Sequence, residues 1–378
     1  MKKVLIVTAL AGFFRSFLTH DILLLQSMGY EVHCAANISH PGSEGMIEYF
    51  DNHNIVFHNI SFSSYKPLSK ETIKATKELK LLLQNYSFDV VHCHTPIAGA
   101  ITRWLCRKQR KKGLKVIYTT HGFYFHKYSS KKAWIIFGTI EKIMSRFCDA
   151  IITINNEDYH NAIKMHCDKV FHINGVGVDT KRFHIKEFDR NEYRQKLGIP
   201  ENALVILAVG ELSERKNQKI IIEALGKLHL PDVLFVHCGN AMNKASTKDL
   251  LVELADELDV NFMMLGLRKD IPQICQCADI GTISSKREGL GLAGIEMLAS
   301  GLPLVASRVH GILDYMEDGI NGYLADPNNA DEFALGISKL VDKNKRASMR
   351  EACIKSAEPF DIECSYKQMR DIYTELLG

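Results

Sequence analysis

The chain has 378 residues, too many for one ordinary hydrophobic core, and this length predicts about two domains. Hydrophobic residues make up 46% of it, with no low-complexity run and no apolar stretch of roughly 18 residues, which indicates a soluble globular enzyme and excludes a membrane-spanning chain. The net charge is only +3, but residues 1–175 hold 22 Lys and Arg against 13 Asp and Glu, whereas residues 176–378 hold 25 against 31.

The N-terminus allows two interpretations. The segment from Met1 to Phe14 superficially resembles a secretory leader, but Arg15 follows at once, and the pattern downstream needs a first strand, so we predict a buried strand at Val4–Val7. The ten cysteines lie mostly inside apolar runs without a CxxC pair, which favours buried free thiols in a reducing compartment over a zinc site. We therefore expect a cytoplasmic protein, with peripheral placement on the inner face of the cell membrane as an extension of that expectation.

Short Val- and Ile-rich runs alternate with helical segments over residues 1–178. Strands are predicted at Val4–Val7, Glu31–Ala35, Val56–Ile60, Asp89–Cys93, Lys115–Thr119, Ala150–Ile154 and Val170–Ile173, and helices near 16–28, 69–85, 97–112, 132–147 and 156–166. Nearly continuous apolar strands separated by helices predict a parallel sheet that is covered on both faces.

The alternation stops and then resumes. Asp179–Asn202 is polar and charged, and we interpret it as the passage between domains. Further strands are predicted at Leu204–Val209, Val233–His237, Asn261–Leu265, Asp279–Ile283 and Pro303–Ala306, and helices near 217–229, 247–258, 291–300 and 330–341. The fold class is therefore α/β, with two doubly wound Rossmann-like domains, 1–178 and 179–362, whose ligands bind at the carboxyl ends of the strands. The last helix, 363–378, is expected to pack back on the first domain.

The densest functional signal follows the predicted strand Asp279–Ile283. The segment 284–292 reads SSKREGLGL and leads into a helix that contains Glu296. Its glycines let backbone N–H groups approach a ligand, and the positive end of the helix suits a pyrophosphate. Turn geometry would explain the glycines alone equally well. Glu288 and Glu296 favour a binding site, because a carboxylate accepts hydrogen bonds from pairs of sugar or ribose hydroxyls.

Glu288 and Glu296 are separated by seven residues, which resembles the EX7E motif of retaining, nucleotide-sugar-dependent glycosyltransferases of family 4 with the two-domain GT-B fold. Other segments that resemble this family run along nearly the whole chain: His92–Pro96, Thr120–Phe123, Asn174–Asp179, Val209–Leu212, Lys216–Asn217, Gly266–Pro272, Gly301–Pro303 and Asp318–Tyr323. In order and spacing they are similar to EpsD-like bacterial enzymes of exopolysaccharide, capsule, lipopolysaccharide and O-antigen synthesis.

The resemblance implies a role for each matching residue in binding the donor. Glu296 binds the ribose, Glu288 contacts the sugar ring, and Lys216 neutralises the diphosphate. The remaining donor-binding residues are Gly12 near the phosphate, Arg268 near the base, and the amides of Gly289, Leu290, Gly291 and Leu292 at the diphosphate or sugar hydroxyls. Many relatives have Arg where this chain has Glu211, which puts a two-cation clamp in doubt, and Arg215 is the candidate substitute.

His121 is the second catalytic candidate beside Glu288. It ends the predicted strand Lys115–Thr119 and precedes Gly122, so we expect it at the rim where the transferred sugar lies. His92 and His94 are expected to point to opposite faces of the preceding strand. The donor half has no DxD motif, so we expect no metal and no other cofactor.

The resemblance implies retaining transfer from a UDP-hexose or UDP-N-acetylhexosamine to a glycan or a polyprenyl-diphosphate-linked acceptor. A nucleotide-sugar epimerase or a phosphorylase on the same fold remains the alternative. A dinucleotide-dependent oxidoreductase is disfavoured, because Thr8–Phe13 lacks the G-x-G-x-x-G pattern. The pair of glutamates argues against a non-catalytic sugar-binding protein, and no nucleic-acid partner is expected.

Two stretches of the basic half suggest contact with an anionic membrane surface. The first is Ile97–Lys112, with Trp104 beside Arg103, Arg107, Lys108, Arg110, Lys111 and Lys112, and the second is His126–Phe137, with Trp134 near Lys127, Lys131 and Lys132. Basic residues beside aromatic ones suit lipid headgroups and the interface below them. The equally weighted alternative is that Trp104 and Trp134 pack in the core and that the lysines form a solvated face.

Overall fold

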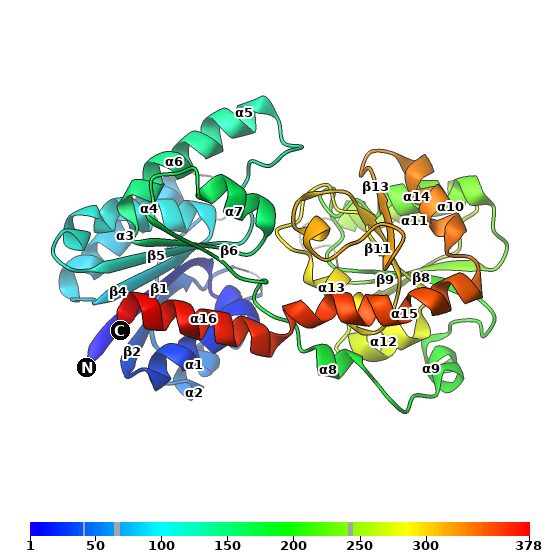
Figure 1. The fold of residues 1–378 in the computed structure, drawn as a ribbon, viewed down its shortest axis with the longest axis horizontal. Helices are drawn as coiled ribbons and strands as arrows, with labels where there is room; N and C mark the ends of the chain where they lie inside the picture. Colours follow the sequence, from blue (N-terminus) through cyan, green and yellow to red (C-terminus); the bar gives the residue numbers. More distant parts are fainter. Residues whose placement is uncertain (41, 64–68, 241–244) are drawn as a thin grey trace. The chain divides into compact units, whose positions relative to one another are not determined.

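The computed structural model describes residues 1–40, 42–63, 69–240 and 245–378. The chain divides into two compact units, one formed by Met1–Val176 with Glu363–Gly378 and the other by Gly177–Ile362 (Figure 1). Beside the boundary, Val178 forms a parallel bridge with Asp361, so the outgoing and returning segments run side by side within the second unit.

The first unit is built on a seven-stranded parallel sheet in the order β3-β2-β1-β4-β5-β6-β7. Its strands are β1 (Lys2–Leu10), β2 (Tyr30–Asn37), β3 (Val56–Asn59), β4 (Val90–His94), β5 (Lys115–Thr120), β6 (Ala150–Thr153) and β7 (Lys169–His172). The residues Val4 to Val7 of β1 are fully buried between β2 and β4. The predicted parallel sheet is therefore confirmed. The apolar run in β1 was a reliable signal because a strand that is covered on both faces must be apolar throughout.

Helices lie on both faces of this sheet (Figure 1). They are η1 (Phe14–Leu18), α1 (Thr19–Ser27), α2 (Met46–Asn52), α3 (Lys70–Asn85), α4 (Pro96–Arg110), α5 (Lys131–Ala133), η2 (Trp134–Gly138), α6 (Thr139–Met144), η3 (Ser145–Phe147), α7 (Asn156–Ala162) and α16 (Ile362–Leu377). The helix α16 returns to this unit, where the Tyr373 hydroxyl lies 2.8 Å from Nδ1 of His92 and the Ser365 hydroxyl donates to the carbonyl of Gly175.

The second unit contains a six-stranded parallel sheet in the order β10-β9-β8-β11-β12-β13. Its strands are β8 (Leu204–Val209), β9 (Val233–Cys238), β10 (Phe262–Gly266), β11 (Ile280–Ile283), β12 (Leu304–Ser307) and β13 (Gly322–Ala325). Its helices are α8 (Thr180–Phe183), α9 (Arg190–Leu197), α10 (Lys219–Leu228), α11 (Ala245–Glu257), α12 (Ile271–Cys277), α13 (Leu292–Ala299), η4 (His310–Asp314), α14 (Ala330–Lys339), α15 (Lys343–Ala357) and η5 (Glu358–Phe360). The sequence pattern missed β13, a four-residue edge strand without a run of β-branched residues, and it also missed α2, α12 and α15.

The interpretation of residues 179–202 as a passage between domains is wrong. The segment forms α8 and α9 within the second unit, and Arg194 of α9 is buried there. Its guanidinium donates to the carbonyls of Cys277, Glu201 and Ala203 and pairs with Asp279 at 2.8 Å. The segment looked like a linker because a buried, hydrogen-bonded arginine has the same sequence signature as a solvated one.

Candidate active site

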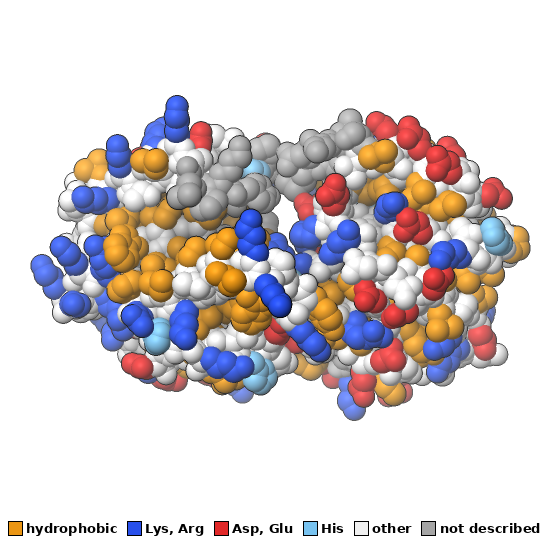
Figure 2. Space-filling model, turned by 90° about the horizontal axis from the view of Figure 1, so that it is seen from above, with side chains coloured by type: hydrophobic (Ala, Val, Ile, Leu, Met, Phe, Trp, Pro, Cys, Tyr) orange, Lys and Arg blue, Asp and Glu red, His pale blue; other side chains and the backbone are white. Residues whose placement is uncertain are grey.

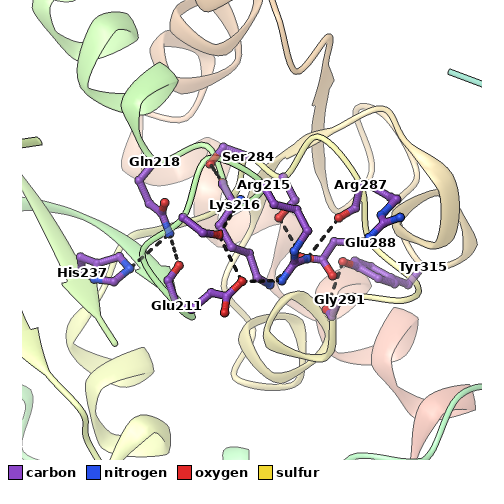
Figure 3. A network of polar contacts seen from close by, with 12 residues as sticks. Glu211, Arg215, Lys216, Gln218, His237, Ser284, Arg287, Glu288, Gly291 and Tyr315 are labelled. Carbon is purple, nitrogen blue, oxygen red and sulfur yellow. Dashed lines mark hydrogen bonds and ion pairs between the residues drawn. The ribbon is translucent and has the colours of Figure 1, made fainter. Parts of the chain in front are cut away.

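The Glu288 loop lies between β11 and α13, beside the loop that follows β8. Because β8 and β11 are parallel neighbours, the loops at their carboxyl ends meet at one edge of the sheet. This brings Glu288 to Lys216, with 2.5 Å between Oε1 and Nζ, and to Arg215, with 3.3 Å between Oε1 and NH1 (Figure 3). Three of the residues expected at the donor therefore form one charged cluster.

Glu288 is 8% exposed and has three donors on one oxygen, since the hydroxyl of Ser285 also donates to Oε1 at 2.8 Å. Burial alone would raise the pKa of this carboxyl. The charges of Lys216 and Arg215, with the hydrogen bonds from Lys216 and Ser285, outweigh burial and hold the pKa below its ordinary value. Glu288 is consequently an ionised carboxylate at neutral pH.

The glycines of the loop are required by close packing. Gly291 adopts φ 83° at the N-terminus of α13, and its carbonyl accepts a hydrogen bond from the hydroxyl of Tyr315. A Cβ atom on Gly294 would lie 2.4 Å from that hydroxyl oxygen, and one on Gly311 would lie 2.0 Å from the carbonyl oxygen of Gly289. The backbone from Gly289 to Leu292 is thus fixed against Tyr315 and Gly311 at the start of α13.

Glu296 has a different environment from Glu288, although both belong to the EX7E motif. It lies within α13, and burial raises its pKa to about 7, opposed by the charge of Arg182. At neutral pH it is therefore present in both protonation states. The two carboxylates are electrostatically distinct: one is held ionised by two cations, and the other is poised to titrate.

Arg268 lies in the loop after β10 and is paired within that loop. Its Nε and NH2 donate to the carboxylate of Asp270 at 2.8 and 2.6 Å, and the same carboxylate accepts a hydrogen bond from the Tyr193 hydroxyl. Arg182 of α8 donates to the carbonyl of Lys269, which ties this loop to α8. Arg268 therefore lies in a fixed loop, and its guanidinium is directed at Asp270.

Gly12 and His121 lie in the first unit. A Cβ atom on Gly12 would lie 2.3 Å from the carbonyl oxygen of Gly42, so glycine is needed there for a close backbone approach. The neighbouring Phe13 packs edge-on against the imidazole of His121, with 4.8 Å between the ring centroids. The loop after β1 thus contacts His121 at the end of β5.

Two buried histidines of β4, His92 and His94, form a group with the partly buried His121 that follows β5. Nε2 of His121 lies 3.1 Å from Nδ1 of His94, and the rings of His92 and His94 are 4.2 Å apart. The expectation that His92 and His94 point to opposite faces is wrong, because residues two apart on a strand share a face. Burial lowers the pKa of His121 to about 4, and burial together with the His121 charge lowers that of His92 to about 3. Both imidazoles are neutral at physiological pH.

Several residues of these sites were missed in the sequence. Ser285 looked like an ordinary turn residue, and Tyr315 is 24 positions from Gly291, with no local signal to connect them. His94 did carry a signal, because a period of two places it with His92 on one face of β4. In the sequence, Glu211 is conspicuous only because many relatives have arginine at its position. In the structure, its carboxylate binds Arg215, with 2.9 Å between Oε1 and NH2.

Comparison with known proteins identifies the family of the chain. The family model described as Glycosyltransferase Family 4 matches residues 23–182, and the model described as Glycosyl transferases group 1 matches residues 189–359. EpsD of Bacillus subtilis (strain 168), named as a glycosyltransferase, is 31% identical over 382 residues, which cover 99% of this chain and 96% of EpsD.

More distant relatives point the same way. The UDP-Gal:alpha-D-GlcNAc-diphosphoundecaprenol alpha-1,3-galactosyltransferase of Escherichia coli is 26% identical over 324 residues, 81% of this chain and 80% of that enzyme. Among solved structures, Anabaena Alr3699/HepE in complex with UDP and glucose matches with a TM-score of 0.79 at 19% identity over the full length of both chains, which supports the expected two-domain fold. The chain therefore belongs to glycosyltransferase family 4, and it is a glycosyltransferase with the GT-B fold.

Proposed function

We propose that the protein is a retaining, metal-independent glycosyltransferase that transfers a hexose or N-acetylhexosamine from a UDP-linked donor. Its acceptor would be a glycan or a polyprenyl-diphosphate-linked sugar in surface polysaccharide synthesis. The observation that carries the donor assignment is the cluster of Lys216 and Arg215 on Glu288 beside α13. The named activity of the Escherichia coli relative and the UDP-glucose complex of HepE support the donor and acceptor classes.

The cluster suits a nucleoside diphosphate leaving group. Lys216 and Arg215 both contact Glu288, and a diphosphate would take both cations as partners. The carboxylate of Glu288 is then free to accept hydrogen bonds from the sugar ring, while Glu296 accepts them from the ribose. Arg268 would frame the base, and the amides of 289–292 would face phosphate or sugar oxygens.

Transfer with retention needs no covalent intermediate in this proposal. The bond between the sugar C1 and the β-phosphate oxygen breaks, the acceptor oxygen bonds to C1 on the same face, and the acceptor proton passes to the departing phosphate oxygen. His121 would hydrogen-bond a sugar hydroxyl as a neutral imidazole, since its pKa is lowered to about 4 by burial. Gly12 would let backbone approach the phosphate.

A panel of nucleotide sugars tests the donor assignment. Saturation-transfer NMR should show UDP-sugars binding, and incubation with a polyprenyl-diphosphate-linked acceptor should yield a glycoside with the anomeric configuration of the donor. An inverted product would refute retention. A new nucleotide sugar formed without an acceptor would favour the epimerase alternative, and a glycosyl phosphate formed from inorganic phosphate would favour the phosphorylase.

We also propose that the first unit binds an anionic membrane surface, and a different observation supports this. The helical segment formed by η2 and α6 exposes Ile135, Ile136, Ile140 and Ile143, whereas its buried side holds Glu141. This reverses the amphipathic pattern of a helix on a soluble protein, in which the apolar side faces inward. Ile135 is 70% exposed, so the row needs an apolar partner.

A buried ion pair fixes that orientation. Arg103 of α4 pairs with Glu141 at 2.8 Å and stacks on the ring of Tyr118, and its guanidinium is fully buried. The expectation that Arg103 belongs to the basic membrane face is therefore wrong. The alternative that Trp104 and Trp134 pack in the core is also wrong, because they are 45% and 39% exposed.

Charge complementarity makes anionic lipid the fitting partner. Three exposed lysines lie close to the apolar row in the chain, Lys131, Lys132 and Lys142, and three more are exposed at the C-terminal end of α4, Lys108, Lys111 and Lys112. Figure 2 shows hydrophobic side chains together with Lys and Arg on the part of the surface formed by this unit. The proposed contact is interfacial, with the cations at lipid headgroups and the apolar side chains just below them. Within the described ranges, no helix has the length and hydropathy to cross a bilayer.

Vesicle flotation at low ionic strength tests the membrane proposal. The protein should float with anionic vesicles, stay behind with neutral ones, and be released as salt rises. Replacing Lys108, Lys111, Lys131 and Lys132 by Ser, or Ile135 and Ile140 by Asn, should abolish flotation. Replacing the exposed Leu250 and Val252 of the second unit by Asn is the matched control and should leave it intact. Equal flotation of all variants would overturn the proposal.

A further inference from the structure

Glu211 and Arg215 form an ion pair at the edge of the phosphate-binding cluster. Glu211 follows the end of β8, and its Oε1 accepts hydrogen bonds from NH2 of Arg215 at 2.9 Å and from the Ser213 hydroxyl at 3.1 Å (Figure 3). The other amino group of Arg215, NH1, lies 3.3 Å from Oε1 of Glu288 and 3.3 Å from the carbonyl oxygen of Arg287. The guanidinium is therefore held from both sides.

Glu288 and Glu211 contact the two cations differently. Glu288 binds Lys216 at 2.5 Å, and this contact is shorter than its contact with Arg215. Glu211 contacts only the far side of Arg215, through NH2. When an anion replaces Glu288 as the partner of NH1, the hydrogen bond between NH2 and Glu211 can persist, because the two amino groups of a guanidinium donate independently.

We propose that Glu211 is a positioning residue for the donor: it binds NH2 of Arg215 so that NH1 is presented, next to Lys216, to the diphosphate. This inference rests on the proposed function and deepens it. A free arginine side chain has many rotamers, and ordering it on binding costs conformational entropy. The Glu211 contact removes part of that cost before the donor arrives.

Removal of the Glu211 carboxylate should change the affinity for anions in opposite directions, depending on whether Glu211 acts through its charge or by positioning Arg215. The carboxylate is close to the proposed diphosphate site, so by charge alone its removal should strengthen anion binding. If Glu211 acts by holding Arg215, its removal should weaken anion binding in spite of the more positive site. The sign of the change in affinity therefore decides between the two.

The experiment measures UDP and inorganic pyrophosphate binding by calorimetry at low salt, without divalent metal. Glu211→Gln should lower both affinities by about threefold to tenfold, and Arg215→Gln by about tenfold. The double variant should bind no more weakly than Arg215→Gln alone, because Glu211 acts through Arg215. Glu211→Asp keeps the carboxylate and should retain most of the affinity.

A matched control separates positioning from general effects. Glu192→Gln removes another carboxylate that pairs with a basic residue four positions away, Lys196 of α9, and should leave binding unchanged. Melting temperatures of all variants should stay near that of the wild type, since Glu211 and Arg215 are partly exposed. If Glu211→Gln does not fold, Glu211→Ser, which also removes the carboxylate, takes its place, with the same expected loss of affinity.

The outcomes distinguish this inference from the proposed function. Wild-type binding of UDP with equal or tighter binding by Glu211→Gln, or additive losses in the double variant, would overturn the positioning role and leave the donor site standing. If the wild type binds neither UDP nor pyrophosphate, the proposed function and this inference both fail.

Discussion

Glu296 illustrates how one side chain can couple donor binding to pH. An ionised carboxylate accepts hydrogen bonds from two ribose hydroxyls, whereas its protonated form has lost part of that capacity. Because burial raises the pKa of Glu296 to about 7, acidification through neutral pH should remove the ionised form that we propose binds the donor ribose. Glu288 should not titrate in this range, since its pKa is held below the ordinary value.

The first prediction concerns Glu296→Gln. The amide keeps the size but not the charge, so UDP-sugar binding should weaken by about 1.5–3 kcal/mol at pH 8. Wild-type affinity should fall as the pH drops from 8 to 6, and the affinity of the variant should stay flat. Calorimetry across this range is the measurement, and a wild type whose affinity does not change with pH would contradict the assignment.

The same group predicts a change in stability of the ligand-free protein. Between the ordinary pKa of 4.5 and about 7 the folded state binds a proton that the unfolded state has lost, so stability falls as the pH rises through this window. Glu296→Gln removes this term. The variant should gain roughly 1–3 kcal/mol over the wild type at pH 8 and nothing at pH 4, measured by urea unfolding. An equal difference at both pH values would exclude titration of Glu296 as its source.

The paired cations lead to a prediction about metal removal. Lys216 and Arg215 can balance the diphosphate without a divalent ion, so transfer should continue in excess EDTA at a rate within about twofold of that without it. Loss of activity in EDTA that magnesium or manganese restores would contradict this. Lys216→Gln and Arg215→Gln should each lower turnover under both conditions.

At the scale of elements, α13 depends on how tightly it packs against Tyr315. Gly294→Ala would place a methyl group 2.4 Å from the Tyr315 hydroxyl oxygen and 2.9 Å from the ring carbon Cζ. The start of the helix must then shift, which we expect to cost about 1–3 kcal/mol of unfolding free energy and to weaken donor binding.

Removing the hydroxyl tests that explanation. Tyr315→Phe alone should be mildly destabilising, because it loses the hydrogen bond to the Gly291 carbonyl. Combined with Gly294→Ala it should recover part of the lost stability, since the closest clash is gone. Strictly additive melting temperatures would show that the cost of Gly294→Ala arises elsewhere.

At the scale of the whole molecule, the first unit is completed by the end of the chain. Tyr373 of α16 is fully buried there, and its hydroxyl meets Nδ1 of the equally buried His92. Deletion of residues 363–378 should therefore expose apolar surface of the first unit and leave the second unit intact. Calorimetry of the truncated chain should show a lower melting temperature for the first unit only. Tyr373→Phe should lower the unfolding free energy of the first unit by about 1 kcal/mol, because one hydrogen bond to His92 is lost. A single unchanged transition would contradict this.

The local sequence was enough to predict the parallel sheets and the family of this protein. Nearly continuous apolar strands such as Val4–Val7 specify parallel sheets, because strands covered by helices on both faces can hold little else. The spacing of Glu288 and Glu296 and the glycines between them resembled the motif of the family, and the relatives of the chain confirmed that family.

Only the tertiary structure decided which distant residues meet. Arg194 and Arg103 looked like surface charges, and their burial depends on partners such as Asp279 and Glu141 that other elements supply. The same is true of Glu211, whose proposed role follows only from the contacts of Arg215 with both Glu211 and Glu288. A hydrogen bond or ion pair between elements leaves no periodic trace in the sequence, whereas burial of a strand or helix face does.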